Sequence, residues 1–371
     1  MRFFRPVRPL VAALLCAGAC VAGTHASAQL FRLPTANRAL FEPAGEERFY
    51  AGTTGKPWAS GTFGCVRSEG WQFHEGLDIR SVTRDKKQEP TDAILATADG
   101  IVAYTNKRSN LSNYGNYLVI MHRVEGLEIF SLYAHLKEIR PGLQYGAPVK
   151  AGEVVALMGR TSNTREQISK ERAHLHFELN LFVNDRFASW YKKFLPTQKN
   201  DHGEYNGLNL LGLDPAAILR EQRAAGKNFS LVKFIQQQPE LCRLFVRKAD
   251  LPWIKRYAPL VTRNPTAERE GVIGYELALN YIGIPCRIIP RAASEVGNTA
   301  RIQLLSVNET EQKKHPCRKL VTADPTSRTP VAMMTAVSGA SFRIWCASQS
   351  PSCPGILTSH RATAGGWSWM R

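Results

Sequence analysis

Two short motifs, about a hundred residues apart, carry the residue types that bind a metal ion. His74-Glu75-Gly76-Leu77-Asp78 and His174-Leu175-His176 together offer three imidazoles and one carboxylate. A catalytic zinc ion commonly takes three such ligands and keeps one position open for water. If the motifs converge in space, the expected chemistry is metal-assisted hydrolysis, and four candidates for three places leave one histidine for another role.

Simple backbone geometry gives the two motifs a way to meet. Residues i and i+2 of a strand project from one face, so a strand over 174–183 would turn both of its imidazoles into one cleft while Leu175 packs behind them. Gly76 lies between His74 and Asp78. A glycine there would let the backbone curl in a turn and bring both side chains to one point. Each motif alone is a weak signal, but the pair predicts a single site.

The segments around these motifs have the composition of short strands separated by turns. No helical periodicity separates them, which predicts a mainly β fold class with an antiparallel β-sheet or sandwich. Polar stretches at 81–92, 161–172 and 184–209 are expected to be loops that rim or cover the site. The predicted strands cover residues 100–105, 117–122, 129–134, 153–158 and 174–183.

Helical signals begin later in the chain. Asp214-Pro215 is a typical helix start and Gly226 a typical stop. Apolar residues between 231 and 245 continue at helical spacing on either side of Pro239. The stretch 252–265 has the character of an irregular connection, and 301–307 and 341–346 of strands. We therefore predict a helical segment followed by a small α+β C-terminal region.

Cysteines add a further expectation for that region. Six remain beyond residue 28, and five of them follow residue 240, namely Cys242, Cys286, Cys317, Cys346 and Cys353; the sixth is Cys65. An even number of cysteines in an exported chain favours disulfide bonds, although six allow 15 connectivities. The C-terminal region is therefore expected to be disulfide-rich.

The first residues have the organisation of a secretory signal peptide. Arg2, Arg5 and Arg8 precede an apolar run over 10–23, and Ala26-Ser27-Ala28 offers a cleavage site before Gln29. The run is short for a membrane span, and no later run approaches the required length. We expect an exported protein, periplasmic or secreted after cleavage near Ala28/Gln29, with no stable transmembrane segment.

The chain is strongly basic. Its formal net charge is +17, and loss of the three leader arginines lowers it to +14. Such a protein is attracted to polyanions. The interleaved basic and aromatic residues of a base-reading module are missing, so nucleic acid is not an expected partner. An anionic envelope polymer fits an exported protein better, and simple solubility is the alternative explanation.

Several further motifs stand in a recognisable order around the two histidine motifs. With them, the segment 61–183 resembles the lysostaphin/LytM-type zinc metallopeptidases (peptidase family M23-like). The resemblance covers about a third of the chain. The motifs are Phe63-Gly64, His74-Glu75-Gly76-Leu77-Asp78, Ala98-Asp99-Gly100-Ile101-Val102, residues 117–122, Tyr133-Ala134-His135-Leu136, Val149-Lys150-Ala151-Gly152 and His174-Leu175-His176-Phe177-Glu178.

The resemblance implies roles for five residues. His74, Asp78 and His176 would bind one zinc ion (Zn2+), and His135 and His174 would be the unliganded histidines of the reaction centre. Zinc would activate a water, one imidazole would move its proton, and the other would help to stabilise the oxyanion. The implied function is an exported zinc metalloendopeptidase that hydrolyses peptide cross-links of peptidoglycan and binds its peptide stems.

The same reading divides the chain into a signal peptide over 1–28, a metallopeptidase domain over 29–225 and a C-terminal accessory region of unknown role over 226–371. The charged stretch 160–173 is longer than in the family. Among the remaining side chains, His122 is expected in the core or beside the site, His202 in a solvated loop, and Glu178 without a catalytic role.

Two other functions stay open at this point. The chain could be a catalytically silent family member that binds the cell wall or regulates another murein hydrolase, although all five histidine and aspartate positions are filled. Alternatively, the same zinc site could act on a protein substrate, and resemblance alone does not decide the substrate.

Overall fold

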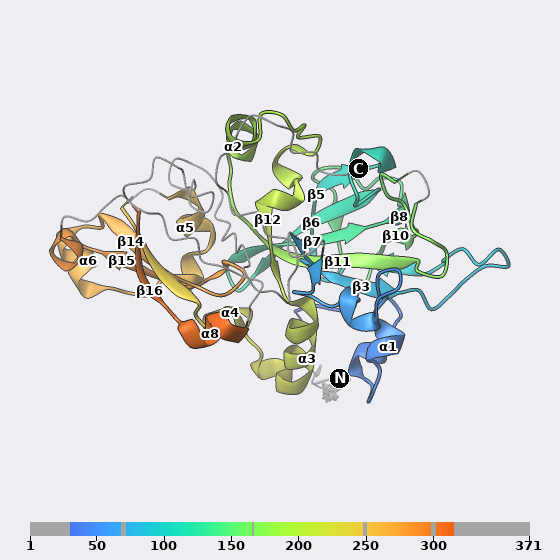
Figure 1. Cartoon of the computed structure of the whole chain (residues 1–371), viewed down its shortest axis with the longest axis horizontal. Coiled ribbons are helices and arrows are strands. Elements are labelled where there is room, and N and C mark those ends of the chain that lie inside the picture. Colours follow the sequence, from blue (N-terminus) through green and yellow to red (C-terminus); the bar gives the residue numbers. More distant parts are fainter. Residues whose placement is uncertain (1–29, 68–71, 165–166, 248–250, 298–301, 315–371) are drawn as a thin grey trace, which may run out of the picture.

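The computed structural model describes residues 30–67, 72–164, 167–247, 251–297 and 302–314 (Figure 1). All pairs of named strands are antiparallel, and the largest sheet has seven of them, ordered β12-β11-β7-β6-β5-β9 with β3 also pairing β11. Its strands are β3 (Leu77–Arg80), β5 (Gly100–Asn106), β6 (Tyr117–Val124), β7 (Leu127–Ala134), β9 (Pro148–Val149), β11 (His174–Phe182) and β12 (Leu210–Leu213). The expected mainly antiparallel β architecture is confirmed.

Smaller elements surround this sheet. A three-stranded sheet has the order β4-β10-β8, and β1 pairs β2. The elements are α1 (Glu46–Phe49), β1 (Val66–Arg67), β2 (Gln72–Phe73), β4 (Ala93–Leu95), β8 (Leu136–Ile139), β10 (Val154–Met158), α2 (Phe187–Phe194), α3 (Pro215–Ala225) and α4 (Leu231–Gln236). The stretch 184–209, which was expected to be a loop, thus contains a helix.

Local sequence explains the best-predicted elements. Strands β6 and β7 form a hairpin whose turn residues Glu125 and Gly126 both have positive φ, as a two-residue hairpin turn requires. Helix α3 begins where expected, because the Asp214 carboxylate accepts hydrogen bonds from two backbone N–H groups of its first turn. All nine residues of β11 are buried, since neighbouring strands cover its edges and packed side chains both faces.

The C-terminal region is α+β, but parts of its path differ from the prediction. Residues expected to continue a helix form β13, the strand between β14 and β16, where Leu244, Phe245 and Val246 are all buried. A short apolar run has no periodicity that separates a central strand from a helix. The stretch expected to be irregular contains α5. The elements are β13 (Cys242–Val246), α5 (Pro252–Arg256), α6 (Pro265–Glu270), β14 (Gly274–Leu279), β15 (Pro285–Arg291), α7 (Ala293–Val296), β16 (Ile302–Val307) and α8 (Glu309–Lys314).

The expected disulfide-rich character of this region is not supported. Within the described part of the chain, no disulfide bond joins any two of Cys65, Cys242 and Cys286. Burial raises the pKa of the Cys286 thiol to about 12, so this side chain is an inert member of the core. The other expected disulfide partners Cys317, Cys346 and Cys353, the predicted strand 341–346 and the leader 1–28 lie outside the described residues.

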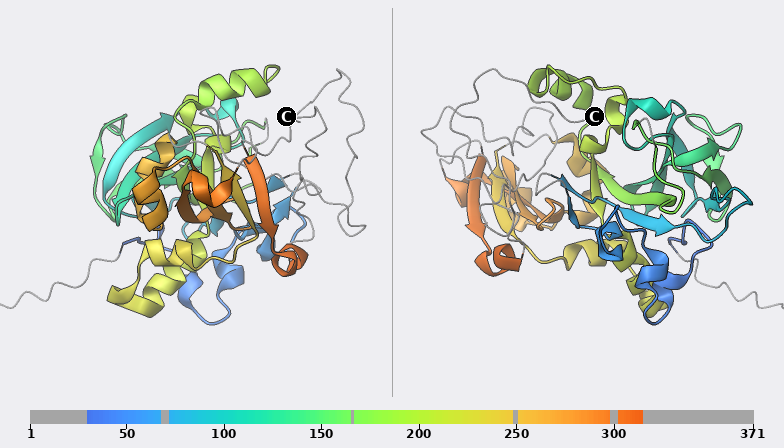
Figure 2. Two further views of the ribbon diagram at one scale, coloured as in Figure 1. Left: turned by 90° about the vertical axis from the view of Figure 1, so that its left-hand side faces the viewer. Right: turned by 45° about the vertical axis from the view of Figure 1, so that its right-hand side comes forward.

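Buried contacts join the C-terminal region to the large sheet, beside which it lies in Figures 1 and 2. The Tyr257 hydroxyl accepts a hydrogen bond from the Phe182 N–H at 2.6 Å and donates one to the Phe182 carbonyl at 3.1 Å. Arg256 pairs with Glu128 at 2.7 Å and with Asp185 at 2.6 Å. A single cluster of buried apolar side chains runs through both parts. None of the helices in the described ranges has the length and apolar character to span a membrane.

Candidate metal centre

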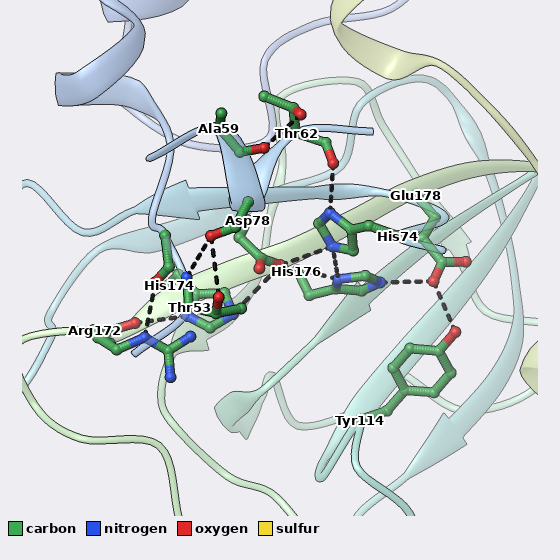
Figure 3. Close-up of polar contacts among 12 residues, drawn as sticks. Thr53, Ala59, Thr62, His74, Asp78, Tyr114, Arg172, His174, His176 and Glu178 are labelled. Atoms are coloured by element: carbon green, nitrogen blue, oxygen red, sulfur yellow. Dashed lines mark hydrogen bonds and ion pairs between the residues drawn. The ribbon is translucent and has the colours of Figure 1, made fainter. Parts of the chain in front are cut away.

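Strand pairing brings the two histidine motifs together. Strands β3 and β11 run antiparallel with Asp78 directly opposite His176. Strand β7 lies on the other side of β11 with Ala134 opposite His176, and His135 follows immediately. The three segments therefore deliver their polar side chains to one point of the sheet, as Figure 3 shows for those from β3 and β11.

Gly76 has a different role from the one expected. It has no positive φ, and Asp78 lies within strand β3 rather than in a turn. A Cβ atom at Gly76 would lie 2.4 Å from the Phe177 carbonyl oxygen and 2.8 Å from the Glu178 Cγ. The glycine is needed because the chain approaches the backbone of β11 closely there, which sets the distance between the motifs.

Three ligand atoms form a nearly equilateral triangle. The His74 Nε2 lies 3.0 Å from the Asp78 Oδ1 and 3.0 Å from the His176 Nδ1, and the last two atoms are 3.1 Å apart. Tetrahedral zinc with bonds of about 2.0–2.1 Å separates its ligands by about 3.3 Å. The donor set and its spacing therefore fit a zinc ion, and among the described residues these three form the group that could hold a metal.

Backbone carbonyls fix the orientation of three imidazoles. The Nδ1–H groups of His74, His135 and His174 donate to the carbonyls of Thr62, Thr161 and Arg172 at 2.8, 2.9 and 2.6 Å. A carbonyl oxygen can only accept, so the proton must be on Nδ1 in each ring. The Nε2 atoms of His74 and His174 consequently face the Asp78 carboxylate, at 3.0 and 3.4 Å.

His176 has the opposite orientation. Its Nε2 donates to Glu178 Oε1 at 2.6 Å, while its Nδ1 faces Asp78. The Tyr114 hydroxyl and the Asn180 amide also donate to the Glu178 carboxylate, at 2.8 and 2.9 Å. A buried carboxylate behind a metal-binding imidazole orients the ring and raises its basicity.

Glu178 and Asn180 were missed as site residues in the sequence. Their signal was the strand period of two, because they continue the spacing that places His174 and His176 on one face of β11. Tyr114 belongs to no motif and comes from a distant loop, so only the fold brings it to this position.

The electrostatics of the metal-free centre follow from burial and close pairing. Burial would raise the pKa of Asp78, but the imidazoles of His74 and His174 outweigh it and hold the pKa well below its usual range. Burial would lower the pKa of His176, yet hydrogen bonds from the ring to Asp78 and Glu178 raise this pKa to about 9. In the metal-free protein His176 is therefore an imidazolium between two carboxylates, with a proton on the nitrogen that faces the triangle.

His135 and His174 lie beside the triangle. Their ring centroids are 4.9 Å apart, and the His135 ring is 6.0 Å from that of His176. Burial, together with the neighbouring imidazoles His174 and His176, lowers the pKa of His135 well below its ordinary value. His135 therefore stays neutral at physiological pH and offers its Nε2 lone pair to a proton.

The predicted position of His122 is confirmed, and that of His202 is wrong. His122 is fully buried in the core, where it contacts the Asp99 carbonyl at 2.9 Å and the Ser131 hydroxyl at 2.7 Å. His202 is buried as well, against the expectation of a solvated loop. Its Nδ1 lies 3.0 Å from the Tyr104 hydroxyl, because the polar stretch 184–209 folds back over the aromatic face of the sheet.

The described parts of the charged stretches 81–92 and 160–173 contact each other beside the centre. Arg160 pairs with Glu89 at 2.9 Å, and Arg84 donates to the Lys170 carbonyl at 2.6 Å. Arg172, next to the motif, reaches the Gly52 carbonyl at 2.8 Å. Both loops thus brace each other and the backbone that orients His174.

A buried triangle of two imidazoles and one carboxylate, with two more imidazoles beside it on an antiparallel sheet, defines a candidate metallohydrolase site. Comparison with known families identifies it further. Residues 72–186 match the model described as Peptidase family M23. The matched range contains all five predicted site residues, and the expected resemblance of this segment to the family is confirmed.

Solved structures with similarity include a zinc containing peptidase from Vibrio cholerae (30% identity, TM-score 0.22) and a putative glycyl-glycine endopeptidase LytM from Ruminococcus gnavus (27%, 0.23). The matches cover 29% of this chain in both cases, and 26% and 39% of those chains. The catalytic domain of lysostaphin from Staphylococcus simulans is 18% identical, with TM-score 0.26, over 40% of this chain and 80% of that one. The chain thus spans about a quarter of the Vibrio protein. Curated proteins give no match.

Proposed function

We propose that the protein is an exported zinc metalloendopeptidase that cleaves peptide cross-links of peptidoglycan. The observation that carries the proposal is the triangle of His74 Nε2, Asp78 Oδ1 and His176 Nδ1, with edges of 3.0–3.1 Å, inside a segment that matches Peptidase family M23. Zinc held by these atoms would act as a Lewis acid and would lower the pKa of a coordinated water.

The chain's own residues divide the remaining work. His135 and His174 each present Nε2 to the centre, since a backbone carbonyl holds the Nδ1 proton of each ring. Either ring can take up a proton there and return it to a leaving amine, which is the role of a general acid–base residue. The Glu178 carboxylate holds the ring of His176 through its hydrogen bond, and Tyr114 and Asn180 in turn hold Glu178.

The proposed substrate rests on the family match and on the signs of export in the sequence. Peptide stems of the cell wall are met outside the cytoplasm, and a leader over residues 1–28 would take the protein there. The filled site favours an active enzyme over a silent binding module, because all three candidate metal ligands and both neighbouring imidazoles are present and buried or nearly so.

Mass spectrometry of sacculus digests tests the proposal. Wild-type protein with zinc should release muropeptides cut in the peptide cross-links, and chelation should stop the release. His74→Ala should lose both zinc and hydrolysis, whereas His174→Ala should keep zinc and lose turnover. His315→Ala, a histidine outside the matched segment, is the control and should behave as wild type.

Folded, zinc-loaded protein that leaves sacculi of several chemotypes intact would overturn the proposed activity. A parallel assay with a pentaglycine peptide and a denatured protein identifies the substrate class. Preferential cleavage of the denatured protein would indicate that the substrate is a protein and not peptidoglycan. Export is tested separately, by N-terminal sequencing of the protein recovered from the periplasm or medium, which should begin at Gln29.

A further inference from the structure

A cavity of about 780 Å³ lies between the first described residues and the C-terminal end of helix α3. It shares no residue with the metal centre. Apolar side chains from both segments, together with Leu95, form part of its lining, and Leu33, Phe41 and Phe229 are examples. Leu30, the first described residue, belongs to this lining, and helix α3, whose end supplies the opposite wall, lies at the lower edge of the molecule in Figure 1.

Four cationic side chains line this cavity, and no acidic side chain does. They are Arg32 and Arg38 from the N-terminal segment, and Arg223 and Lys227 from the end of α3 and the turn after it. All four are exposed. Four positive charges around one hollow create a potential that attracts an anion.

None of these four cations forms an ion pair with a described residue, which sets them apart from several arginines elsewhere in the molecule. Arg140, Arg160, Arg243 and Arg256, for example, all pair with carboxylates. Arg223 has only the ring of Phe41, 4.7 Å below its guanidinium carbon. The cavity thus keeps its donors available for a ligand.

The walls of the cavity are held in place by buried hydrogen bonds. The Gln222 amide accepts from the Phe31 N–H at 2.9 Å and donates to the Phe31 carbonyl at 2.7 Å. The Arg32 N–H donates to the Thr97 carbonyl at 2.7 Å, and the Thr97 hydroxyl donates to the Arg32 carbonyl at 2.6 Å. The cationic groups therefore project from a fixed frame, which lowers the entropic cost of binding.

The two terminal segments outside the described residues are poor occupants of this cavity. Residues 1–29 contain three arginines and no acidic residue, and residues 315–371 contain six basic residues and one aspartate. Both would be repelled by four cations. A lipid bilayer is also disfavoured, since none of the large exposed apolar side chains (Val82, Ile101, Tyr145, Val154 and Leu305) belongs to the cavity.

We propose that this cavity binds a stretch of anionic carbohydrate polymer from outside the chain. Its phosphate or carboxylate groups pair with Arg32, Arg38, Arg223 and Lys227, and its sugar or polyol backbone lies against the apolar wall formed by Leu33, Phe41 and Phe229. The site goes beyond the proposed hydrolysis, because it tethers the protein to the polymer without contact to the metal centre.

Isothermal titration of the full chain tests the site with three probes: a polyglycerol phosphate oligomer, an alginate oligomer and neutral dextran. Saturable binding of one or both charged probes, and none of dextran, is expected. The first two probes distinguish phosphate from carboxylate as the recognised group. Binding is measured without hydrolysis, so the result is independent of whether the metal centre cleaves peptidoglycan.

Two variants and one matched control locate the binding. Arg223→Gln/Lys227→Gln removes two cavity cations and should weaken binding at least about tenfold, because hydrogen bonds to charged groups are the strong ones. Ala36→Trp fills the cavity without a change of charge and should have a similar effect. Lys107→Gln/Arg108→Gln removes one lysine and one arginine elsewhere and should leave binding within about twofold, as expected for exposed charges outside a site.

Equal weakening by both double variants would overturn the proposal, because diffuse surface charge would then account for the binding. Failure of both charged oligomers to bind would overturn it as well. Tighter binding to vesicles that contain phosphatidylglycerol, with loss in the cavity variants, would assign the cavity to a lipid headgroup and would also contradict a polymer site.

Discussion

Glu178 should control the zinc affinity of the centre through His176. The Glu178 carboxylate is fully buried and accepts the His176 Nε2–H at 2.6 Å. In the native protein the Asn180 amide donates to the second Glu178 oxygen at 2.9 Å. In Glu178→Gln the new amide oxygen can still accept from His176, but the new amide nitrogen then faces the Asn180 donor and cannot accept from it. The charge and one good hydrogen bond are lost together.

The loss of zinc affinity in Glu178→Gln should depend on pH, because Glu178 also sets the pKa of His176. Partners behind a metal-binding histidine change affinity by about 10–100-fold, or about 1.4–2.8 kcal/mol. Burial alone would lower the pKa of His176, but Asp78 and Glu178 raise it to about 9. At pH 7.5 the native protein must therefore release a proton to bind zinc, which weakens its affinity about 30-fold.

In the glutamine variant the pKa of His176 falls toward its ordinary value. Less proton release is then needed at pH 7.5, and zinc binding is weakened less by it. Its affinity defect should therefore be about 10–100-fold at pH 9.5 and much smaller at pH 7.5. Competition with a chromophoric chelator at both pH values measures the ratio. Tyr114→Phe removes one hydrogen bond to the Glu178 carboxylate but leaves its charge in place, so it should show a milder affinity defect than Glu178→Gln.

Glu276→Gln is the matched control. Glu276 is also buried and pairs with Arg243 and Arg291, but it lies in the C-terminal sheet. The variant should lower stability and leave zinc affinity unchanged at either pH. A folded Glu178→Gln protein whose zinc affinity stays within twofold of the native value at pH 9.5, or whose defect is the same at both pH values, refutes the reasoning.

Three further changes test the fold around the centre. Burial lowers the pKa of His122 from 6.5 to about 4, so its contribution to stability is present above pH 6.5 and is lost as the pH falls to 4; urea unfolding of His122→Gln should show up to about 3 kcal/mol less loss over this window. Gly76→Ala places a Cβ 2.4 Å from the Phe177 carbonyl oxygen and should cost about 1–3 kcal/mol of stability, with weaker zinc binding by chelator competition; native affinity in this variant would contradict the close-approach argument. Tyr257→Phe leaves the Phe182 N–H and carbonyl without their buried partner and should cost about 1–3 kcal/mol in urea unfolding, whereas an unchanged midpoint would remove this anchor from the account.

Elements could be predicted from the sequence where the residue types and the periodicity of apolar residues indicated the same secondary structure. Strand β11 could be predicted because His174 and His176 alternate with apolar residues, and helix α3 because Asp214-Pro215 and Gly226 mark its ends. The disulfide expectation is not supported, and the helix expected near 241–245 is wrong. Both concern the C-terminal region, where the family resemblance offered no guide and short apolar runs are ambiguous.

The outer parts of the centre depended on long-range contacts that no local pattern reveals. Tyr114 reaches Glu178 across 64 positions in the chain, and His202 is buried against Tyr104 across 98. A polar loop composition favours solvent for His202, yet packing of the stretch 184–209 on the aromatic face overrides it. The motifs offered four candidate ligands and the family resemblance selected the three residues of the triangle, but the groups that hold these side chains only became visible in the fold.

Strand β11 carries most of the side chains on which the candidate centre depends. Residues 174, 176, 178 and 180 of β11 alternate on one face and supply a neighbouring imidazole, a candidate ligand, its supporting carboxylate and that carboxylate's amide partner. A register slip of one residue would turn all four to the opposite face. Gly76 lies against Phe177 near the middle of β11 and holds the register there, and Tyr257 binds the backbone of Phe182 at the end of the strand. The C-terminal region is therefore coupled to the centre through the strand that carries it, and Tyr257→Phe should weaken zinc binding as well as stability, although Tyr257 touches no residue of the triangle.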